Sequence, residues 1–213
     1  MSVLASDTFT RADATTLGAN WGSSGGLGTS CGIVSNQVDV TVTGSRCGNT
    51  YTAVTWPDDH YSKATVVALP SNTWAVLVRM QVGASRNYYA AGVNPNDFGD
   101  SQTRIWKEVA GVETGLATSG TVDITAGSVV ELDIQSTTLT CKVDGITKVS
   151  VTDGSFPSGT PGILLQHTAI NVGLLDNWEG GDFGGAPPPP DPDSDSGAVQ
   201  LPVQPDPITV SVW

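Results

Sequence analysis

Residues 138–151 read Thr138-Leu-Thr-Cys-Lys-Val-Asp-Gly-Ile-Thr-Lys-Val-Ser-Val151, and this stretch decides which kind of fold to expect. Apolar and polar residues alternate on both sides of its Asp-Gly pair, which is typical of two antiparallel strands joined by a tight turn. The pair alone suggests a two-residue turn. The faces favour a three-residue loop at 143–145, because that loop sets Leu139 opposite Val149 and gathers on the solvent face Thr140, Lys142, Lys148 and Ser150. The sequence therefore predicts a β-hairpin with a glycine bulge.

The same alternation extends outward from this hairpin over the first 180 residues. Trp74, Val76, Val78 and Met80 alternate with Leu77, Arg79 and Gln81, as expected for a half-buried strand. Further strand candidates, separated by Gly, Pro, Asn or Asp, are 61–68, 87–93, 103–109, 128–135, 162–168 and 171–178. Short antiparallel strands hide their apolar faces by stacking as two sheets. We therefore expect an all-β fold, a two-sheet antiparallel jelly-roll sandwich with an extended proline-rich C-terminal arm.

Charge and hydropathy exclude two classes of partner. The net charge is -12, and no basic residue follows Lys148. Nucleic acid is excluded as a partner because binding its backbone needs a basic face. No run reaches the roughly 20 apolar residues of a membrane span, and the N-terminus lacks the cationic start of a signal peptide. We expect a soluble chain without membrane contact.

The composition divides the chain into a domain and an arm. We predict a folded domain at 1–182, a linker rich in Gly, Pro and Asp at 183–207, and a docking strand at 208–213. Four consecutive prolines, Pro187 to Pro190, favour an extended linker that buries little apolar surface. The last six residues alternate like a strand, and a β-prone uncharged end needs a partner surface. The predicted partner-binding residues are Ile208, Val210, Val212 and Trp213.

Several short motifs carry a resemblance. They are Asp7-Thr-Phe-Thr-Arg-Ala-Asp13, Trp56-Pro-Asp-Asp-His-Tyr61, Gly159-Thr-Pro-Gly162 and Leu175-Asp-Asn-Trp178. In this order they resemble the concanavalin A-like lectin/glucanase domains of the laminin-G-like kind, which are often met in bacterial and phage proteins. The resemblance covers about residues 7–182. It implies that the first and last strands lie side by side, with Phe9 near Trp178.

The arm does not belong to that pattern. A small jelly roll without a signal peptide, with three cysteines and a docking arm, resembles a bacteriophage structural protein. Our first hypothesis is a non-catalytic virion protein, a capsid decoration or tail-associated assembly module. Its partners are other virion proteins of the capsid or tail, or further copies of itself, and its location is the virion after synthesis in the host cytoplasm. The alternative is a lectin-like module that binds surface glycans, and the third hypothesis is a degenerate glycanase.

One strand imitates a glycanase motif. Retaining glucanases of the resembled superfamily carry Glu-x-Asp-x-Glu on one strand, and this chain has Glu131-Leu-Asp-Ile-Gln135. The spacing puts Glu131, Asp133 and Gln135 on one face, but Gln135 cannot deliver the proton that hydrolysis needs. We predict no catalytic residue and no enzyme activity.

Aromatic residues are the candidates for sugar contact. Jelly-roll lectins stack loop aromatics on sugar rings, and Trp56, Tyr88 and Trp106 have polar neighbours that favour exposure. Trp74 and Trp178 are predicted to be core residues.

No cofactor or metal site is expected. The Asp191–Gly197 stretch lacks the acid that closes an EF-hand loop, and the two histidines, His60 and His167, lie far apart in the sequence. The stretch Asn94–Asp100 fits either a plain turn or a set of calcium ligands, and both alternatives stay open.

The three cysteines cannot all pair within one chain. Cys31 and Cys47 could meet across a strand pair, and whether they are bridged is left open. Cys141 alternates with Leu139 and Val143, so we predict that it is a small buried apolar residue.

Overall fold

The structure, a computed structural model, describes residues 1–23, 27–69, 73–81, 83, 86–93, 102–170 and 173–184. Within these ranges the chain forms fifteen strands and no helix, so none of these residues lies in a helix that could cross a bilayer. The strands are β1 (Ser2–Asp7), β2 (Trp21–Ser23), β3 (Gly32–Val34), β4 (Gln37–Asp39), β5 (Arg46–Tyr51), β6 (His60–Val66), β7 (Trp74–Gln81), β8 (Asn87–Val93), β9 (Gln102–Val109), β10 (Val112–Val122), β11 (Val129–Gln135), β12 (Thr138–Val143), β13 (Ile146–Thr152), β14 (Thr160–Gln166) and β15 (Leu175–Asp182).

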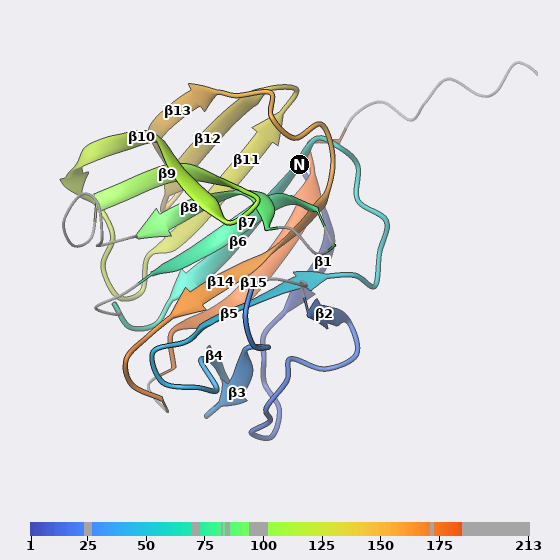
Figure 1. Ribbon diagram of the computed structural model, residues 1–213, viewed down its shortest axis with the longest axis vertical. Coiled ribbons are helices and arrows are strands. Elements are labelled where there is room, and N and C mark those ends of the chain that lie inside the picture. Colours follow the sequence, from blue (N-terminus) through green and yellow to red (C-terminus); the bar gives the residue numbers. More distant parts are fainter. Residues whose placement is uncertain are drawn as a thin grey trace, which may run out of the picture.

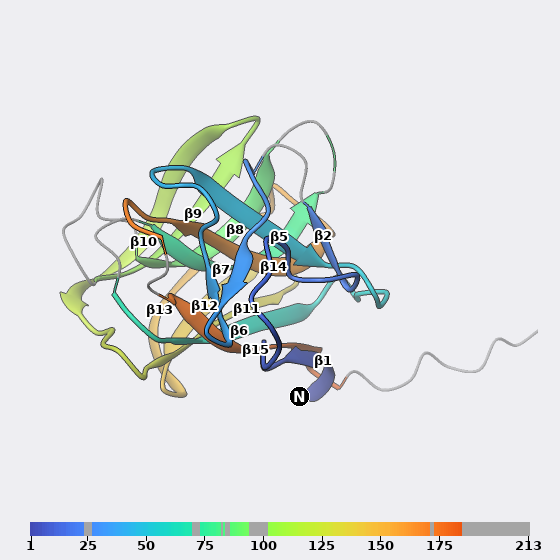
Figure 2. The same cartoon turned by 90° about the horizontal axis from the view of Figure 1, so that it is seen from below.

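The strands form two antiparallel sheets that pack face to face, which confirms the predicted sandwich. Sheet A has the order β13-β12-β11-β6-β15-β4-β3, with β1 also paired to β15. Sheet B has the order β10-β9-β8-β7-β14-β5-β2. Figure 1 shows β11 to β13 behind β8 to β10, and the second view shows β5 and β14 layered over β6 and β15 (Figure 2). Each sheet therefore has one inner face and one outer face.

The core lies between the sheets because every second residue of the central strands is apolar. Val130, Leu132 and Ile134 of sheet A and Val76 and Val78 of sheet B are fully buried. The predicted core positions of Trp74 and Trp178 are confirmed by their burial. Trp178 also stacks on the Tyr51 ring, with centroids 5.1 Å apart.

The first and last strands are neighbours, as the resemblance implies. In the register of β1 with β15, Asp7 pairs with Trp178 and Ser2 pairs with Asp182. Phe9 packs on Trp21, which in turn contacts Trp178 at 4.8 Å between ring centroids. The described part of the chain ends at Gly184, just past this strand pair. The docking residues Ile208, Val210, Val212 and Trp213 lie outside the described residues.

The 138–151 hairpin exists, but its predicted register is wrong. The turn is the two-residue Asp144-Gly145, with φ angles of 52° and 77°, and Val143 pairs with Ile146. The bulge lies outside the turn, where the register shifts between Cys141 and Lys142. As a result, Leu139 pairs with Val151 instead of Val149. An Asp-Gly turn suits the twist of a hairpin, and the bulge lets Val149 and Val151 of β13 pack against the core while Ile146 is exposed.

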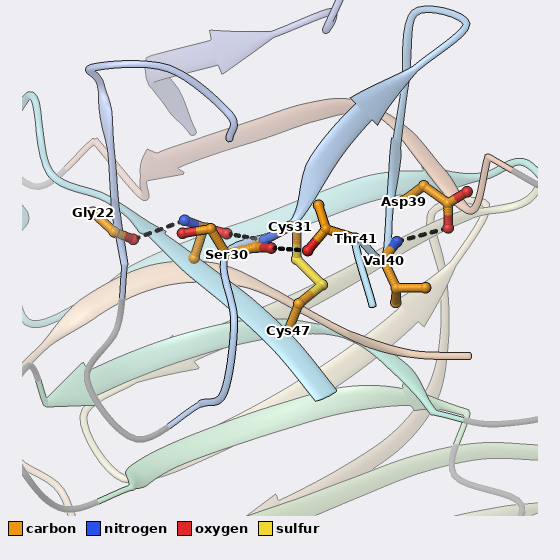
Figure 3. Close-up of a disulfide and its surroundings, with 8 residues drawn as sticks. Gly22, Ser30, Cys31, Asp39, Val40, Thr41 and Cys47 are labelled. Carbon is orange, nitrogen blue, oxygen red and sulfur yellow. Dashed lines mark hydrogen bonds between the residues drawn. A yellow bond between two sulfur atoms is a disulfide. The ribbon is translucent and has the colours of Figure 1, made fainter. Parts of the chain in front are cut away.

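The two cysteines left open by the sequence are joined. Cys31, just before β3, and Cys47 in β5 form a disulfide across a sequence separation of 16 residues (Figure 3). Asn49 supports the same region, because its Oδ1 accepts the Cys31 N–H at 2.8 Å and its Nδ2 donates to the Gly22 carbonyl at 3.1 Å. Cys141 is a free, buried thiol, as predicted, and burial raises its pKa.

Candidate functional site

Two of the three predicted sugar-contacting aromatics are not exposed. Tyr88 on β8 and Trp106 on β9 have 0% exposed surface, so the expectation of exposure is wrong for both. They belong to a second apolar cluster on the outer face of sheet B, with Leu27, Leu77 and Met80 among its members. Trp56 is half-buried, and its Nε1 donates to the Tyr51 carbonyl at 2.8 Å. Sugar contact by any of the three remains a prediction.

An ionic network surrounds Tyr88 and Trp106. The buried carboxylate of Glu108 accepts a hydrogen bond from the Tyr88 hydroxyl and pairs with Arg46 at 2.6 Å. The Arg104 guanidinium lies 5.5 Å from the centre of the Trp106 ring. Burial and the nearby carboxylate hold the pKa of Tyr88 well above its usual range. These contacts tie β5, β8 and β9 together, so the network serves the stability of sheet B.

The outer face of sheet A is different, because it is polar and open. Glu131, Asp133 and Gln135 share this face, as their spacing predicts. The Lys142 ammonium on the neighbouring strand pairs with Glu131 at 2.7 Å and with Asp133 at 2.5 Å. On the other side of β11, Asp133 is directly opposite Tyr61 of β6. The two acids are therefore held together by one cation from the neighbouring strand β12.

A hollow of about 410 Å³ opens on this face beside Asp133. Its lining is a carboxylate, a carboxamide and two hydroxyls, from Asp133, Gln135, Thr138 and Thr140. Asp133 is only 4% exposed, and its Oδ1 has no hydrogen-bond partner among the described residues. A buried, unpartnered carboxylate oxygen carries a desolvation cost.

The same burial changes the acidity of Asp133. Burial raises its pKa to about 6, the Lys142 ammonium opposes the rise, and the negative charge of Glu131 adds to it. Asp133 therefore changes its charge close to neutral pH, within reach of a ligand in the hollow.

Beside Asp133, the strands β6 and β15 supply a second cluster of polar side chains, formed by Tyr61, Lys63 and Glu179. The Tyr61 hydroxyl donates to Glu179 Oε1 at 2.7 Å, and the Lys63 ammonium pairs with the same oxygen at 2.7 Å. Burial and Glu179 raise the pKa of Tyr61, so this hydroxyl stays protonated. The polar surface around the hollow is thus built from groups that hold one another in fixed positions.

His60 does not offer a chemical group to solvent. Its Nδ1 contacts the Pro57 carbonyl at 2.7 Å, and its Nε2 accepts the backbone N–H of Arg79 at 3.2 Å. Burial lowers its pKa to about 4, so the ring is neutral and donates from Nδ1. His60 therefore holds the end of β7 against the start of β6.

The described ranges contain no group of three or more His, Cys, Asp or Glu side chains placed to bind a metal ion. The candidate loop Asn94–Asp100 and the Asp191–Gly197 stretch lie outside those ranges, and so the choice between turn and calcium loop stays open.

The spacing of Glu131, Asp133 and Gln135 predicts their shared face, but the hollow beside them was not predicted. Thr140 was expected only on the solvent face of a hairpin, and no sequence signal marks the alignment of Thr138 and Thr140 with the Asp133 strand. That alignment depends on the register of β11 with β12, in which Asp133 pairs with Thr140 and Gln135 with Thr138.

No protein-family model matches the chain, and no curated protein matches its sequence. Solved structures match its fold. The carbohydrate-binding module CBM66 from Bacillus subtilis has a TM-score of 0.55 at 14% identity, over 77% of this chain and 93% of that one. The VIP36 exoplasmic/lumenal domain in its Ca2+/Man3GlcNAc-bound form has a TM-score of 0.56 at 13% identity, over 81% and 89% of the two chains.

A protein of unknown function with a galectin-like fold, also from Bacillus subtilis, has a TM-score of 0.56 at 10% identity, over 84% of this chain and 96% of that one. At such low identities these matches show a shared fold. The fold is the jelly roll of lectin-like domains, in agreement with the concanavalin A-like resemblance of the sequence.

Proposed function

We propose that this protein is a carbohydrate-binding module and that it binds sugar on the outer face of sheet A. The observation that carries the proposal is the hollow at Asp133, whose lining combines a carboxylate, an amide and two hydroxyls. Sugars present dense arrays of hydroxyls that both donate and accept hydrogen bonds, and such a lining offers partners for both. The lectin-like fold supports the same function by analogy.

The module binds without hydrolysis in this proposal. A retaining glycosidase needs two carboxyl groups on either side of the scissile bond, one of them free to donate a proton. Here one ammonium, that of Lys142, pairs with both acids, with Glu131 at 2.7 Å and with Asp133 at 2.5 Å. Gln135 is an amide and cannot replace either acid.

Gln135→Ala and Thr140→Val test the site. Each removes one hydrogen-bonding group from the hollow, so we expect each to weaken sugar binding about 3- to 10-fold, the usual value of one hydrogen bond. The screen is a glycan array, and affinities are measured by calorimetry on the sugars that bind. Thr114→Val on β10 is the matched control, because Thr114 is exposed and lies on sheet B. Absence of any bound sugar at millimolar concentration would refute the proposal.

Assembly in a virion is the second candidate, favoured by the exposed edge at β1. Val3 on this strand is 56% exposed, and the strand lies beside the end of β15, where the described chain ends. We propose that residues 208–213 add a strand to such an edge on a second copy. Deleting residues 185–213 should then convert an oligomer to a monomer in light scattering, with unchanged thermal unfolding. A full-length chain that is already monomeric at high concentration would contradict it.

A further inference from the structure

A second hollow lies close to the first. It has a volume of about 280 Å³ and is bordered by Asp58, Asp59, Ser136, Thr137, Phe156 and Pro157. These residues come from the segment before β6, the β11–β12 turn and the loop after β13. All of these segments meet at one end of the sandwich.

Only the two-residue turn Ser136-Thr137 separates the hollows. Gln135 and Thr138, on either side of this turn, line the first hollow, and the turn residues themselves line the second. The turn is held rigidly, because the Ser136 N–H donates to Asp59 Oδ1 at 2.7 Å and the Thr137 carbonyl accepts the Asp153 N–H at 2.9 Å. The surface between the hollows is therefore a short, fixed ridge.

The chemistry of the second hollow also suits a sugar residue. Asp58 and Asp59 both line the hollow and are exposed, with 52% of the Asp59 side chain exposed. Phe156 and Pro157 supply an apolar part of the lining. A sugar ring has hydroxyls around its edge and carbon-bound hydrogens on its faces, so it matches a polar rim over an apolar surface.

Arg79 keeps this hollow in shape. Its side chain is only 3% exposed, and its guanidinium donates to the Asp58 carbonyl at 3.0 Å and to the Phe156 carbonyl at 2.9 Å. It also pairs with Asp59 at 3.2 Å. Two borders of the hollow are thus fixed to one buried cation, so the shape exists before any ligand arrives.

We infer that the two hollows are adjacent subsites for one ligand, a linear oligosaccharide that crosses the Ser136-Thr137 turn. The inference rests on the proposed function of the first hollow. It predicts that the chain binds a trisaccharide more tightly than the corresponding monosaccharide, because only the longer sugar contacts both hollows.

Asp58→Ala tests the inference on the full chain. Only the Asp58 backbone carbonyl bonds to Arg79, so the substitution leaves that contact in place. The probes are mannose and mannotriose, glucose and cellotriose, and galactose and galactotriose, measured by calorimetry. We expect Asp58→Ala to weaken trisaccharide binding about tenfold and to leave monosaccharide binding unchanged, whereas Gln135→Ala weakens both. Asp13→Ala, an exposed carboxylate away from both hollows, is the control.

The outcomes separate the two proposals. Equal affinity for monosaccharide and trisaccharide, or an Asp58→Ala variant that weakens both alike, overturns the paired subsites and leaves sugar binding at Asp133 standing. Binding of none of the six sugars by the wild-type chain, with Asp58→Ala and Gln135→Ala equally silent, removes the sugar-binding function and the subsites with it.

Discussion

Replacing both Cys31 and Cys47 with serine is expected to lower the free energy of unfolding by about 3 kcal/mol, the usual value for a bridge that closes a loop of this length. The two residues are 16 positions apart, and the bridge joins the segment before β3 to β5 (Figure 3). Without it the unfolded chain gains conformational freedom, while the folded chain keeps the Asn49 hydrogen bond to Cys31. Urea unfolding followed by tryptophan fluorescence measures the change.

A reductant supplies the control for this experiment. Dithiothreitol should destabilise the wild-type chain by about the same amount and should leave the double variant unchanged, since Cys141 is a free buried thiol in both. A double variant that unfolds at the same urea concentration as the wild type would show that the bridge contributes nothing.

The strands whose two faces the sequence predicts well are those with one dry face and one wet face. β11 and β12 alternate cleanly because their outer face meets water, and their predicted ranges agree closely with the structure. β5 was not predicted, since Arg46–Tyr51 shows no alternation, and the structure buries Cys47 to Tyr51 on both faces. A strand that is covered on both sides need not alternate. β7 does alternate, but the expectation that it is half-buried is wrong, because Leu77 and Arg79 on its second face are also buried.

The same cover explains the wrong expectation for Tyr88 and Trp106. The polar neighbours of Trp106 include Arg104 and Glu108, which are themselves buried in the ionic network of sheet B, and Tyr88 pairs with Glu108 across the strands. Residue type alone cannot distinguish a polar side chain in water from one that pairs with a buried charge.

Only one part of the candidate site could be predicted from the sequence. The shared face of Glu131 and Asp133 follows from spacing, but the Lys142 contacts follow from pairing between strands.

Sugar binding by the wild-type chain is expected to weaken by up to about tenfold as the pH falls from 7.5 to 5. Burial raises the pKa of Asp133 to about 6, so its carboxylate takes up a proton in this range and loses one acceptor for sugar hydroxyls. The charged or titratable groups that face it are Glu131 on its own strand, Lys142 on β12, and Tyr61 and Lys63 on β6. Calorimetry at a series of pH values measures the change.

Asp133→Asn separates binding from stability. The variant should bind sugar at least tenfold more weakly at pH 7.5, with an affinity that no longer depends on pH between 5 and 7.5. The free energy of unfolding of the variant, in contrast, should rise at this pH. The raised pKa means that the folded wild type holds the proton more tightly than the unfolded chain does. Protonated Asp133 therefore contributes fully to stability below pH 3.8, which is the ordinary pKa of an aspartate. This contribution is lost as the pH rises through about 6, the pKa in the folded chain.

Asn carries no charge to bury, so at pH 7.5 the variant should be more stable than the wild type by on the order of 1 to 2 kcal/mol, and the difference should vanish near pH 4. Asp123→Asn is the matched control, because Asp123 pairs with Lys148 at 3.2 Å and its pKa is lowered by hydrogen bonds, with Ser119 the largest cause. That variant should lose a little stability at neutral pH and keep its sugar affinity.

A destabilised Asp133→Asn chain that still binds sugar normally would show that Asp133 serves stability and that sugar binds on another face. A stabilised chain that no longer binds would show that the fold keeps an unfavourable buried charge because the ligand needs it.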